Sequence, residues 1–312
     1  MHDSNSTQKN RSAANFPPEV GKLAIISNST SGLGFEIALG LAQAGADVVL
    51  TGRNAAEGHD ALARIRQLAP NTLARYEKLD LESQTSVTDF ALRRTRIGRP
   101  VDLLINYAST LALLRRQVTR DRFELHLGTN YLAHFSLTAR LLPLLRQSKQ
   151  PRVVQVTSAG RHHGEIHLDD LQLERNYTPL KAYSQSKLAM LIFAIELQRQ
   201  SDAHGWGLLA SAAQPLGARA AHIANATEVK GSFRWYRRAL GLVPQQLGGA
   251  LQALLTRTET ESEQDSSNGK GLADLIGPPA PEALDMRVLD SAMGRILWEV
   301  STHLTKVEWP TL

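Results

Sequence analysis

A tyrosine and a lysine four residues apart form the most informative pair in this chain. Tyr183 and Lys187 stand at positions i and i+4 of a stretch with a helical pattern, so their side chains share one helix face. A free tyrosine, with a pKa of roughly 10, is a poor proton donor or acceptor at neutral pH. A cation held near the ring favours the phenolate and lowers that pKa, which suits general acid/base catalysis. By itself the pair is weak evidence and is better explained as two half-exposed helix residues, so its meaning depends on its surroundings.

Short apolar runs alternate with helical patterns along the chain. Runs that predict strands cover residues 23–27, 47–51, 74–79, 101–105, 152–157 and 207–213, and helices are predicted over residues 33–44, 55–68, 86–96, 121–146, 182–200 and 284–304. This alternation is typical of parallel βαβ units, and near-continuous apolar strands suit a sheet buried on both faces. The sequence therefore predicts an α/β fold with a doubly wound parallel sheet between two layers of helices.

The composition of the chain limits the classes of protein to which it can belong. The chain has 312 residues, 42% of them hydrophobic, and no cysteine, which excludes disulfides and thiol nucleophiles and suits a cytoplasmic location. Residues 1–20 are polar and predict a flexible N-terminal leader, with residues 21–312 forming a single domain. No run of 18 apolar residues occurs, so we expect no membrane span. The net charge of +5 favours anionic ligands but is too diffuse to indicate nucleic acid.

A glycine-bearing turn follows the first predicted strand. A turn of this kind at a helix N-terminus presents unpaired N–H groups and the positive end of the helix dipole, which suits a pyrophosphate. A simple tight turn is the alternative. The residues that would bind the cofactor here are Ser27, Asn28, Ser29, Ser31, Gly32, Leu33 and Gly34.

The end of the second predicted strand carries Gly52 and Arg53 where an acidic residue would bind a ribose diol. Arginine offers a bidentate donor for a phosphate instead. The pair therefore favours NADP(H) over NAD(H), although a surface arginine is the alternative. Asp80 and Leu81, at the end of the third strand, are placed to meet an adenine amino group.

Further motifs complete a recognisable set. They are Leu103–Ser109, Thr129–Phe135, Val153–Ser158, Asp169–Gln172 and Leu297–Ser301. Together with the turn, the arginine and the Tyr–Lys pair, they make the chain similar to the short-chain dehydrogenase/reductase family over about residues 20–305. The middle of the chain most resembles the retinol-dehydrogenase-like branch. The resemblance implies a Rossmann-type three-layer α/β/α sandwich.

The resemblance also implies a catalytic tetrad of Asn130, Ser158, Tyr183 and Lys187. Ser158 would orient the substrate oxygen, and Tyr183 would exchange the proton there while hydride moves to or from the nicotinamide. Lys187 would bind the ribose and depress the pKa of Tyr183, and Asn130 would hold a water that links the lysine to solvent. A helix cap at Ser158 and a buried structural amide at Asn130 are the alternatives. Tyr183 and Lys187 would also touch the cofactor, with Asn106, Ala108 and Pro215.

Several positions depart from the family pattern. Ser27-Asn28 replaces Thr-Gly, Asn106-Tyr107-Ala108-Ser109 replaces Asn-Asn-Ala-Gly, Pro215-Leu216 replaces Pro-Gly, and Ala220 replaces a threonine. The segment from Gly269 lacks the usual aromatic last strand. All but the last of these departures concern the cofactor, so cofactor affinity is the weak point.

The combined pattern predicts an NADP(H)-dependent oxidoreductase that interconverts a carbonyl and an alcohol on a lipophilic or aromatic small molecule. Residues 216–280 would form a substrate lid and a variable loop. A catalytically weak or inactive protein that uses the fold as a nucleotide-binding scaffold is the alternative. Sugar epimerase or dehydratase chemistry is disfavoured, because the turn is not G-x-x-G-x-x-G.

The remaining predictions concern metals and partners. His162, His163 and His167 cluster after the serine, but they lack the carboxylate or cysteine frame of a metal site. We expect a small-molecule carbonyl or alcohol substrate, no nucleic acid, no metal, and assembly as a homodimer or homotetramer.

Overall fold

The computed structural model describes residues 18–108, 115–213 and 290–310. A parallel sheet of order β3-β2-β1-β4-β5-β6 runs through them. The order reverses between β1 and β4, which makes the sheet doubly wound and leaves a crevice at the carboxyl ends of these strands. Its strands are β1 (Leu23–Ile26), β2 (Asp47–Gly52), β3 (Ala74–Lys78), β4 (Leu103–Asn106), β5 (Arg152–Val156) and β6 (Leu209–Ala213).

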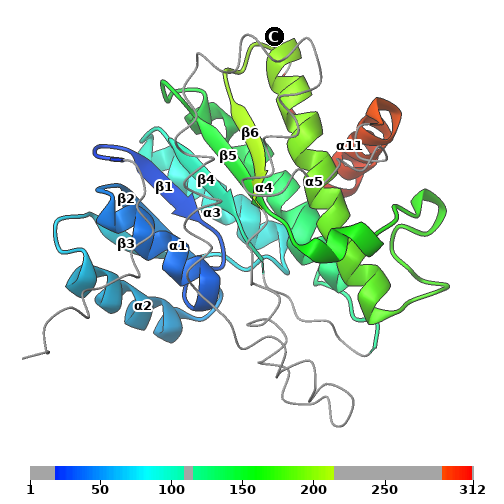
Figure 1. Cartoon of the computed structure of the whole chain (residues 1–312), viewed down its shortest axis with the longest axis horizontal. Coiled ribbons are helices and arrows are strands. Elements are labelled where there is room, and N and C mark those ends of the chain that lie inside the picture. The colour runs from blue at the N-terminus through cyan, green and yellow to red at the C-terminus, as the bar shows by residue number, and fades with distance from the viewer. Residues whose placement is uncertain (1–17, 109–114, 214–289, 311–312) are drawn as a thin grey trace, which may run out of the picture.

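Helices cover both faces of the sheet (Figure 1). One face packs against α1 (Gly32–Gln43) and α2 (Ala55–Leu68). The other packs against α3 (Gln84–Ile97), α4 (Ala133–Leu145) and α5 (Pro179–Ala203). The predicted α/β/α layering is therefore confirmed in the described residues.

A further helix, α11 (Ser291–Thr305), lies on the outer side of α5 and also contacts α4 (Figure 1). Aromatic rings join these elements: Trp298 of α11 lies 5.0 Å from Phe135 and 6.0 Å from Phe193, ring centroid to centroid. Trp309 adds a ring 4.3 Å from that of Trp298. Of the helix predicted over residues 284–304, residues 284–289 lie outside the described ranges, and α11 begins at Ser291 with Asp290 as its N-cap.

The helix predicted over residues 121–146 is wrong at its start. Residues around Asp121 form a turn, and Val118 pairs with Glu124 in an isolated antiparallel bridge. The following turn, η1 (Leu127–Leu132), is a π-helix, and α4 continues from it. A π-helical turn holds one residue more than an α-helical turn. It therefore changes the direction in which the side chain of Asn130 points.

No helix in the described ranges is long and apolar enough to cross a membrane. Most of the predicted leader, residues 1–17, lies outside those ranges, as do Ser109, Pro215, Leu216, Ala220, Gly269 and the predicted lid over residues 216–280.

Candidate active site

Helix α5 carries Tyr183 and Lys187 on one face, as the spacing predicts. The helix starts sharply because Pro179 stands in its first turn and the Thr178 hydroxyl accepts the Lys181 amide at 3.1 Å. The Nζ atom of Lys187 lies 5.9 Å from the centroid of the Tyr183 ring. The ammonium group of Lys187 therefore lies close to the aromatic ring of Tyr183.

Lys187 is buried where two central strands end. Its Nζ atom donates to the carbonyl oxygen of Ala108, just past β4, and to that of Val156 at the end of β5, each at 3.3 Å. Burial lowers the pKa of Lys187 to about 7, because desolvation penalises the ammonium form. The lysine can therefore exchange a proton close to neutral pH.

Ser158 lies beside Tyr183, since a Cβ atom at Gly160 would lie 2.9 Å from Tyr183 Cε1 and 3.7 Å from Ser158 Oγ. Burial raises the pKa of Tyr183 above its usual value, and the hydrogen bond with Ser158 acts in the opposite direction. We expected Lys187 to lower this pKa. In the structure burial has the largest effect on Tyr183, and the net shift of its pKa is upward.

Ser158 also begins the short 3-10 turn η2 (Ala159–His163). Its extended backbone lets the hydroxyl accept the Gly160 amide at 3.2 Å. Ser158 therefore does cap this turn, which was the alternative role considered for it, and it also lies beside Tyr183. A Cβ atom at Gly160 would lie 2.9 Å from Cε1 of Tyr183, so the tyrosine ring occupies space that only glycine leaves free. Gly160 was not among the residues predicted from the sequence.

Asn130 joins the site through a hydroxyl of α5. It is fully buried in the π-helical turn η1, and its Nδ2 atom donates to Ser186 Oγ at 2.9 Å. Ser186 in turn donates to the carbonyl oxygen of Tyr183 at 2.7 Å. The Asn130 Oδ1 atom is buried without a hydrogen-bond partner. The structure therefore brings Asn130 to the tetrad as a structural amide, while the expected water link to Lys187 stays a prediction.

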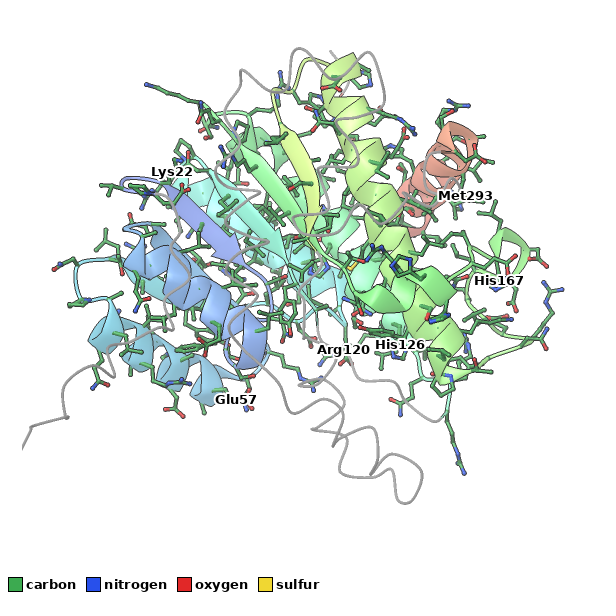
Figure 2. The ribbon with its side chains drawn as sticks, viewed as in Figure 1. Lys22, Glu57, Arg120, His126, His167 and Met293 are labelled. Carbon is green, nitrogen blue, oxygen red and sulfur yellow. The ribbon has the colours of Figure 1, made fainter. Side chains whose placement is uncertain are left out.

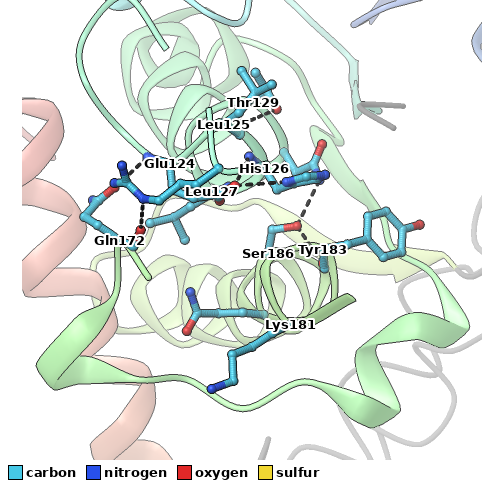
Figure 3. A network of polar contacts seen from close by, with 12 residues as sticks. Glu124, Leu125, His126, Leu127, Thr129, Gln172, Lys181, Tyr183 and Ser186 are labelled. Carbon is cyan, nitrogen blue, oxygen red and sulfur yellow. Dashed lines mark hydrogen bonds and ion pairs between the residues drawn. The ribbon is translucent and has the colours of Figure 1, made fainter. Parts of the chain in front are cut away.

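A buried histidine lies beside Tyr183 and is held by a buried acid, and neither residue was predicted from the sequence (Figure 3). Glu124 accepts the His126 and Leu127 amides at 3.0 and 2.8 Å and contacts the His126 ring at 3.0 Å. The His126 ring lies edge-on to that of Tyr183, with centroids 6.2 Å apart. Gln172 Oε1 accepts the Glu124 amide at 2.6 Å. The sequence signal that could have identified Glu124 and His126 is an acidic residue at the start of a helix, two residues before a histidine.

The glycine-bearing turn contains two residues with left-handed backbones and leads into a helix without a side-chain cap. Asn28 and Gly32 have left-handed backbones, with φ of 49° and 55°, a conformation that asparagine and glycine tolerate. A Cβ atom at Gly34 would collide with the Asn28 carbonyl. Helix α1 begins at Gly32 behind the exposed Ser31, whose side chain makes no cap hydrogen bond. The first amides of α1, including that of Leu33, therefore have no side-chain cap from Ser31.

Two hydroxyls of the predicted cofactor turn are engaged inside the protein. Ser27 Oγ accepts the Tyr107 amide at 2.7 Å and lies 2.8 Å from His134 Nε2. Ser29 Oγ donates to the Ile26 carbonyl at 2.8 Å and accepts the Thr51 amide at 2.9 Å. Ser27 and Ser29 therefore shape the turn from within.

Arg53 lies at the end of β2 with an exposed side chain, but it is paired. Its Nη1 atom is 2.7 Å from Glu82 Oε1, with 70% and 35% of the two side chains exposed. Asp80 accepts the Glu82 amide at 3.1 Å and lies 3.2 Å from Arg120 Nη2, while Leu81 packs against the core. Arg120 and His126 lie near the ends of the strands (Figure 2).

The segment after β4 is held on both sides. Asn106 is fully buried and donates from Nδ2 to Thr138 Oγ1 at 3.0 Å. The Tyr107 ring is buried, and a Cβ atom at Gly34 would lie 3.0 Å from its Cδ1 atom. Ala108 provides the carbonyl that accepts Lys187. Asn106 and Ala108 therefore border the site, with the Asn106 side chain facing inward.

His162 and His163 are exposed, and His167 lies 3.9 Å from Glu165. Across the described residues, no group of three histidine, cysteine or acidic side chains is arranged to hold a metal ion.

The sequence of this chain is similar to those of several known dehydrogenases. The mouse (Mus musculus) polyprenol dehydrogenase is 40% identical over 204 residues, which cover 64% of this chain and 61% of that protein. Human (Homo sapiens) retinol dehydrogenase 13 is 31% identical over 304 residues, or 94% of this chain and 87% of that protein. The match to the polyprenol dehydrogenase thus leaves more than a third of that protein uncovered.

Solved structures agree on the fold. A crystal structure of an uncharacterized protein from Mycobacterium paratuberculosis superposes with a TM-score of 0.72 at 32% identity, over 96% of this chain and 98% of that chain. A short chain dehydrogenase from Shigella flexneri complexed with NADP shares 22% identity over 68% of this chain and 84% of that chain, with a TM-score of 0.53. This second structure shows that the two proteins share a fold.

The family profile of the short chain dehydrogenases matches residues 22–228. That range includes the glycine-bearing turn, Asn130, Ser158, Tyr183 and Lys187. The chain therefore belongs to the short chain dehydrogenase family, in its retinol-dehydrogenase-like branch.

Proposed function

We propose that this protein is an NADP(H)-dependent oxidoreductase that interconverts a carbonyl and an alcohol on a lipophilic small molecule. The observation that carries the proposal is the grouping of Tyr183 and Ser158 around Gly160, beside a buried Lys187 at the ends of β4 and β5. This constellation pairs a proton donor with a group that can orient the same substrate oxygen. Relatives named for polyprenol and retinol support a lipophilic alcohol or aldehyde.

The residues present fit a nicotinamide nucleotide. The start of α1 offers amides at a positive helix end, and the left-handed Asn28 and Gly32 allow a close backbone approach. The carboxyl ends of β1 and β4, where the strand order reverses, border the same crevice. The cofactor, when bound, supplies or takes the hydride.

The protein's own groups would manage the proton. In reduction, Tyr183 gives its hydroxyl proton to the substrate oxygen, and in oxidation it takes that proton back. Ser158 holds the substrate oxygen and, by its hydrogen bond, favours the tyrosinate form. Lys187, whose pKa burial lowers to about 7, can pass a proton onward near neutral pH. Asn130 would keep α5 in place through Ser186.

The preference for NADP(H) rests on Arg53. Its guanidinium is exposed at the end of β2, the position at which this fold reads the ribose 2′ group. Glu82 holds it at 2.7 Å, so a 2′-phosphate would have to compete with a carboxylate. Exposed ion pairs are worth only about 0–1 kcal/mol, and a doubly charged phosphate can displace the carboxylate.

The proposal is tested by titrating the purified full chain with NADPH and then NADH, followed by turnover of retinaldehyde and of a polyprenal. We expect selective NADPH binding and measurable oxidation of NADPH with one of these aldehydes. Tyr183→Phe should bind NADPH and lose turnover, because it keeps the ring and removes only the proton donor. A Tyr183→Phe variant as active as the wild type would overturn the mechanism. Absence of binding of either nucleotide would favour the scaffold alternative.

A further inference from the structure

His134 occupies an unusual position between the cofactor turn and the catalytic tetrad. It is fully buried near the start of α4. Its Nδ1 atom lies 2.7 Å from the carbonyl oxygen of Asn130, and its Nε2 atom lies 2.8 Å from Ser27 Oγ. One ring therefore spans from the first residue of the glycine-bearing turn to the tetrad asparagine.

The neighbours of the His134 ring determine where its proton resides. A carbonyl oxygen can only accept, so Nδ1 carries the hydrogen that faces Asn130. Burial lowers the pKa of His134 to about 4, and the charge of Lys187 acts in the same direction. The ring is therefore neutral at physiological pH, which leaves Nε2 as an acceptor towards Ser27.

Ser27 has one hydroxyl proton and a fixed set of neighbours. Its Oγ atom accepts the Tyr107 amide at 2.7 Å, which leaves the proton to be donated. The carbonyls of Tyr107 and Ile105 lie 2.8 and 3.2 Å away, and the Ile105 carbonyl already accepts the Ser27 amide at 3.0 Å. The neutral His134 ring therefore provides one of two acceptors that lie 2.8 Å from Ser27 Oγ, the other being the Tyr107 carbonyl.

The contacts continue on both sides of the ring. On one side, Asn130 reaches the backbone of Tyr183 through Ser186. On the other, Ser27 Oγ accepts the amide of Tyr107, which follows β4 directly. The imidazole is thus the side-chain link in a continuous path of hydrogen bonds from the cofactor turn to the catalytic tyrosine.

We propose that His134 is a positioning residue that couples occupancy of the cofactor turn to the placement of Asn130 and Tyr183. It touches no reacting atom and acts through Ser27 and Asn130. This inference rests on the proposed function, because it takes the turn to be a nicotinamide nucleotide site. A shift of the turn on cofactor binding reaches the tetrad through one rigid ring, which has no internal torsion to absorb the movement.

The first test is a double-mutant cycle in NADPH affinity, measured by nicotinamide fluorescence on the full chain. His134→Leu and Ser27→Ala should each weaken NADPH binding about tenfold, and the double variant should also weaken it about tenfold, because both substitutions break the same link. His134→Gln should recover most of the affinity, since a carboxamide also has one donor and one acceptor. Additive losses, about a hundredfold in the double variant, would overturn the coupling.

Tyr131→Phe is the matched control. Tyr131 is buried in the same helical segment, and its hydroxyl lies 2.6 Å from Ser301 Oγ on α11, away from the turn. The variant should lower the melting temperature and leave NADPH affinity and the cycle unchanged. If Tyr131→Phe weakened NADPH binding as much as His134→Leu, general loosening of the helix would explain both, and the proposal would be wrong.

A second measurement does not depend on the variants folding. Nitrogen-15 NMR of the wild-type imidazole should show a neutral ring protonated at Nδ1 at pH 7, with signals that shift when NADPH is added. A ring protonated at Nε2, or signals indifferent to bound NADPH, would overturn the coupling while leaving the proposed function intact. Wild-type protein that binds neither NADPH nor NADH would overturn both proposals together.

Discussion

Asn130 is joined to Tyr183 through a single intervening hydroxyl group, that of Ser186. The Asn130 amide donates to Ser186 Oγ at 2.9 Å, and Ser186 donates to the Tyr183 carbonyl at 2.7 Å. The π-helical turn η1 is therefore fastened to α5 at the residue that carries the proton donor. This contact makes the position of the tyrosine depend on the asparagine side chain.

Removing the Ser186 hydroxyl should weaken catalysis more than cofactor binding. Ser186→Ala leaves the buried Asn130 amide without its acceptor, which costs about 1–3 kcal/mol of stability. We expect kcat to fall about tenfold, because the tyrosine loses part of its alignment. Steady-state kinetics with NADPH and an aldehyde substrate measure this loss. Ser184→Ala is the matched control, since the Ser184 hydroxyl is buried on the same helix without a hydrogen-bond partner. Equal effects of the two substitutions would contradict the link.

A methyl group at position 160 should displace the catalytic ring. The Cβ atom of Gly160→Ala would lie 2.9 Å from Cε1 of Tyr183, closer than carbon atoms approach without repulsion. We expect kcat to drop by about tenfold to a hundredfold while NADPH is still bound. Fluorescence titration and kinetics on the same preparation separate the two effects. An unchanged kcat would show that the ring has room to move without loss of function.

Much of the fold could be predicted because its signals are local. Apolar runs of strand length, glycine turns and helical periodicity specify the alternation of strands and helices within short windows. The left-handed conformation of Asn28 is one that its residue type tolerates. The helix expected from residue 121 could not be corrected from the sequence, because the bridge between Val118 and Glu124 and the π-helical turn depend on tertiary contacts.

The residues that form the candidate site could be predicted from the sequence, but the contacts that their side chains make could not. Tyr183, Lys187, Ser158 and Asn130 come together as the family resemblance implies. The direction in which Ser27 points is not encoded by its residue type, because serine suits a phosphate loop and an internal brace equally well. The pairing of Arg53 with Glu82 likewise joins residues from two strand ends that meet only in the folded sheet.

The preference for NADPH should depend on Arg53 and should be limited by Glu82. Arg53→Ala should weaken NADPH binding about tenfold or more and leave NADH binding nearly unchanged, because only NADPH carries the 2′-phosphate. Glu82→Gln should strengthen NADPH binding up to about fivefold, the equivalent of losing an exposed ion pair of about 1 kcal/mol.

Titration of each variant with both nucleotides measures this selectivity. Arg96→Ala, which removes the same charge from an exposed position on α3, controls for the change in net charge. Equal weakening of NADPH by Arg53→Ala and Arg96→Ala, or equal weakening of NADPH and NADH by Arg53→Ala, would remove the argument for a 2′-phosphate site.

Lys187 should give the protein a stability that rises with pH above neutrality. Its pKa is about 7 in the folded protein, against roughly 10.4 in an unfolded chain. Between these values the unfolded chain binds more protons than the folded protein, so the free energy of unfolding increases with pH. The cost of burying the charged lysine is complete below about pH 7 and is relieved as the pH approaches about 10.4.

Urea denaturation of the wild type and of Lys187→Met at pH 7.5, 8.5 and 9.5 isolates this contribution, because the other titrating groups are common to both proteins. The free energy of unfolding of the wild type should gain on that of the variant by about 1 kcal/mol per pH unit across this range. Parallel dependences on pH would mean that Lys187 keeps an ordinary pKa in the folded protein. A lysine with an ordinary pKa would remain charged across the whole working range and could not relay a proton from Tyr183 near neutral pH.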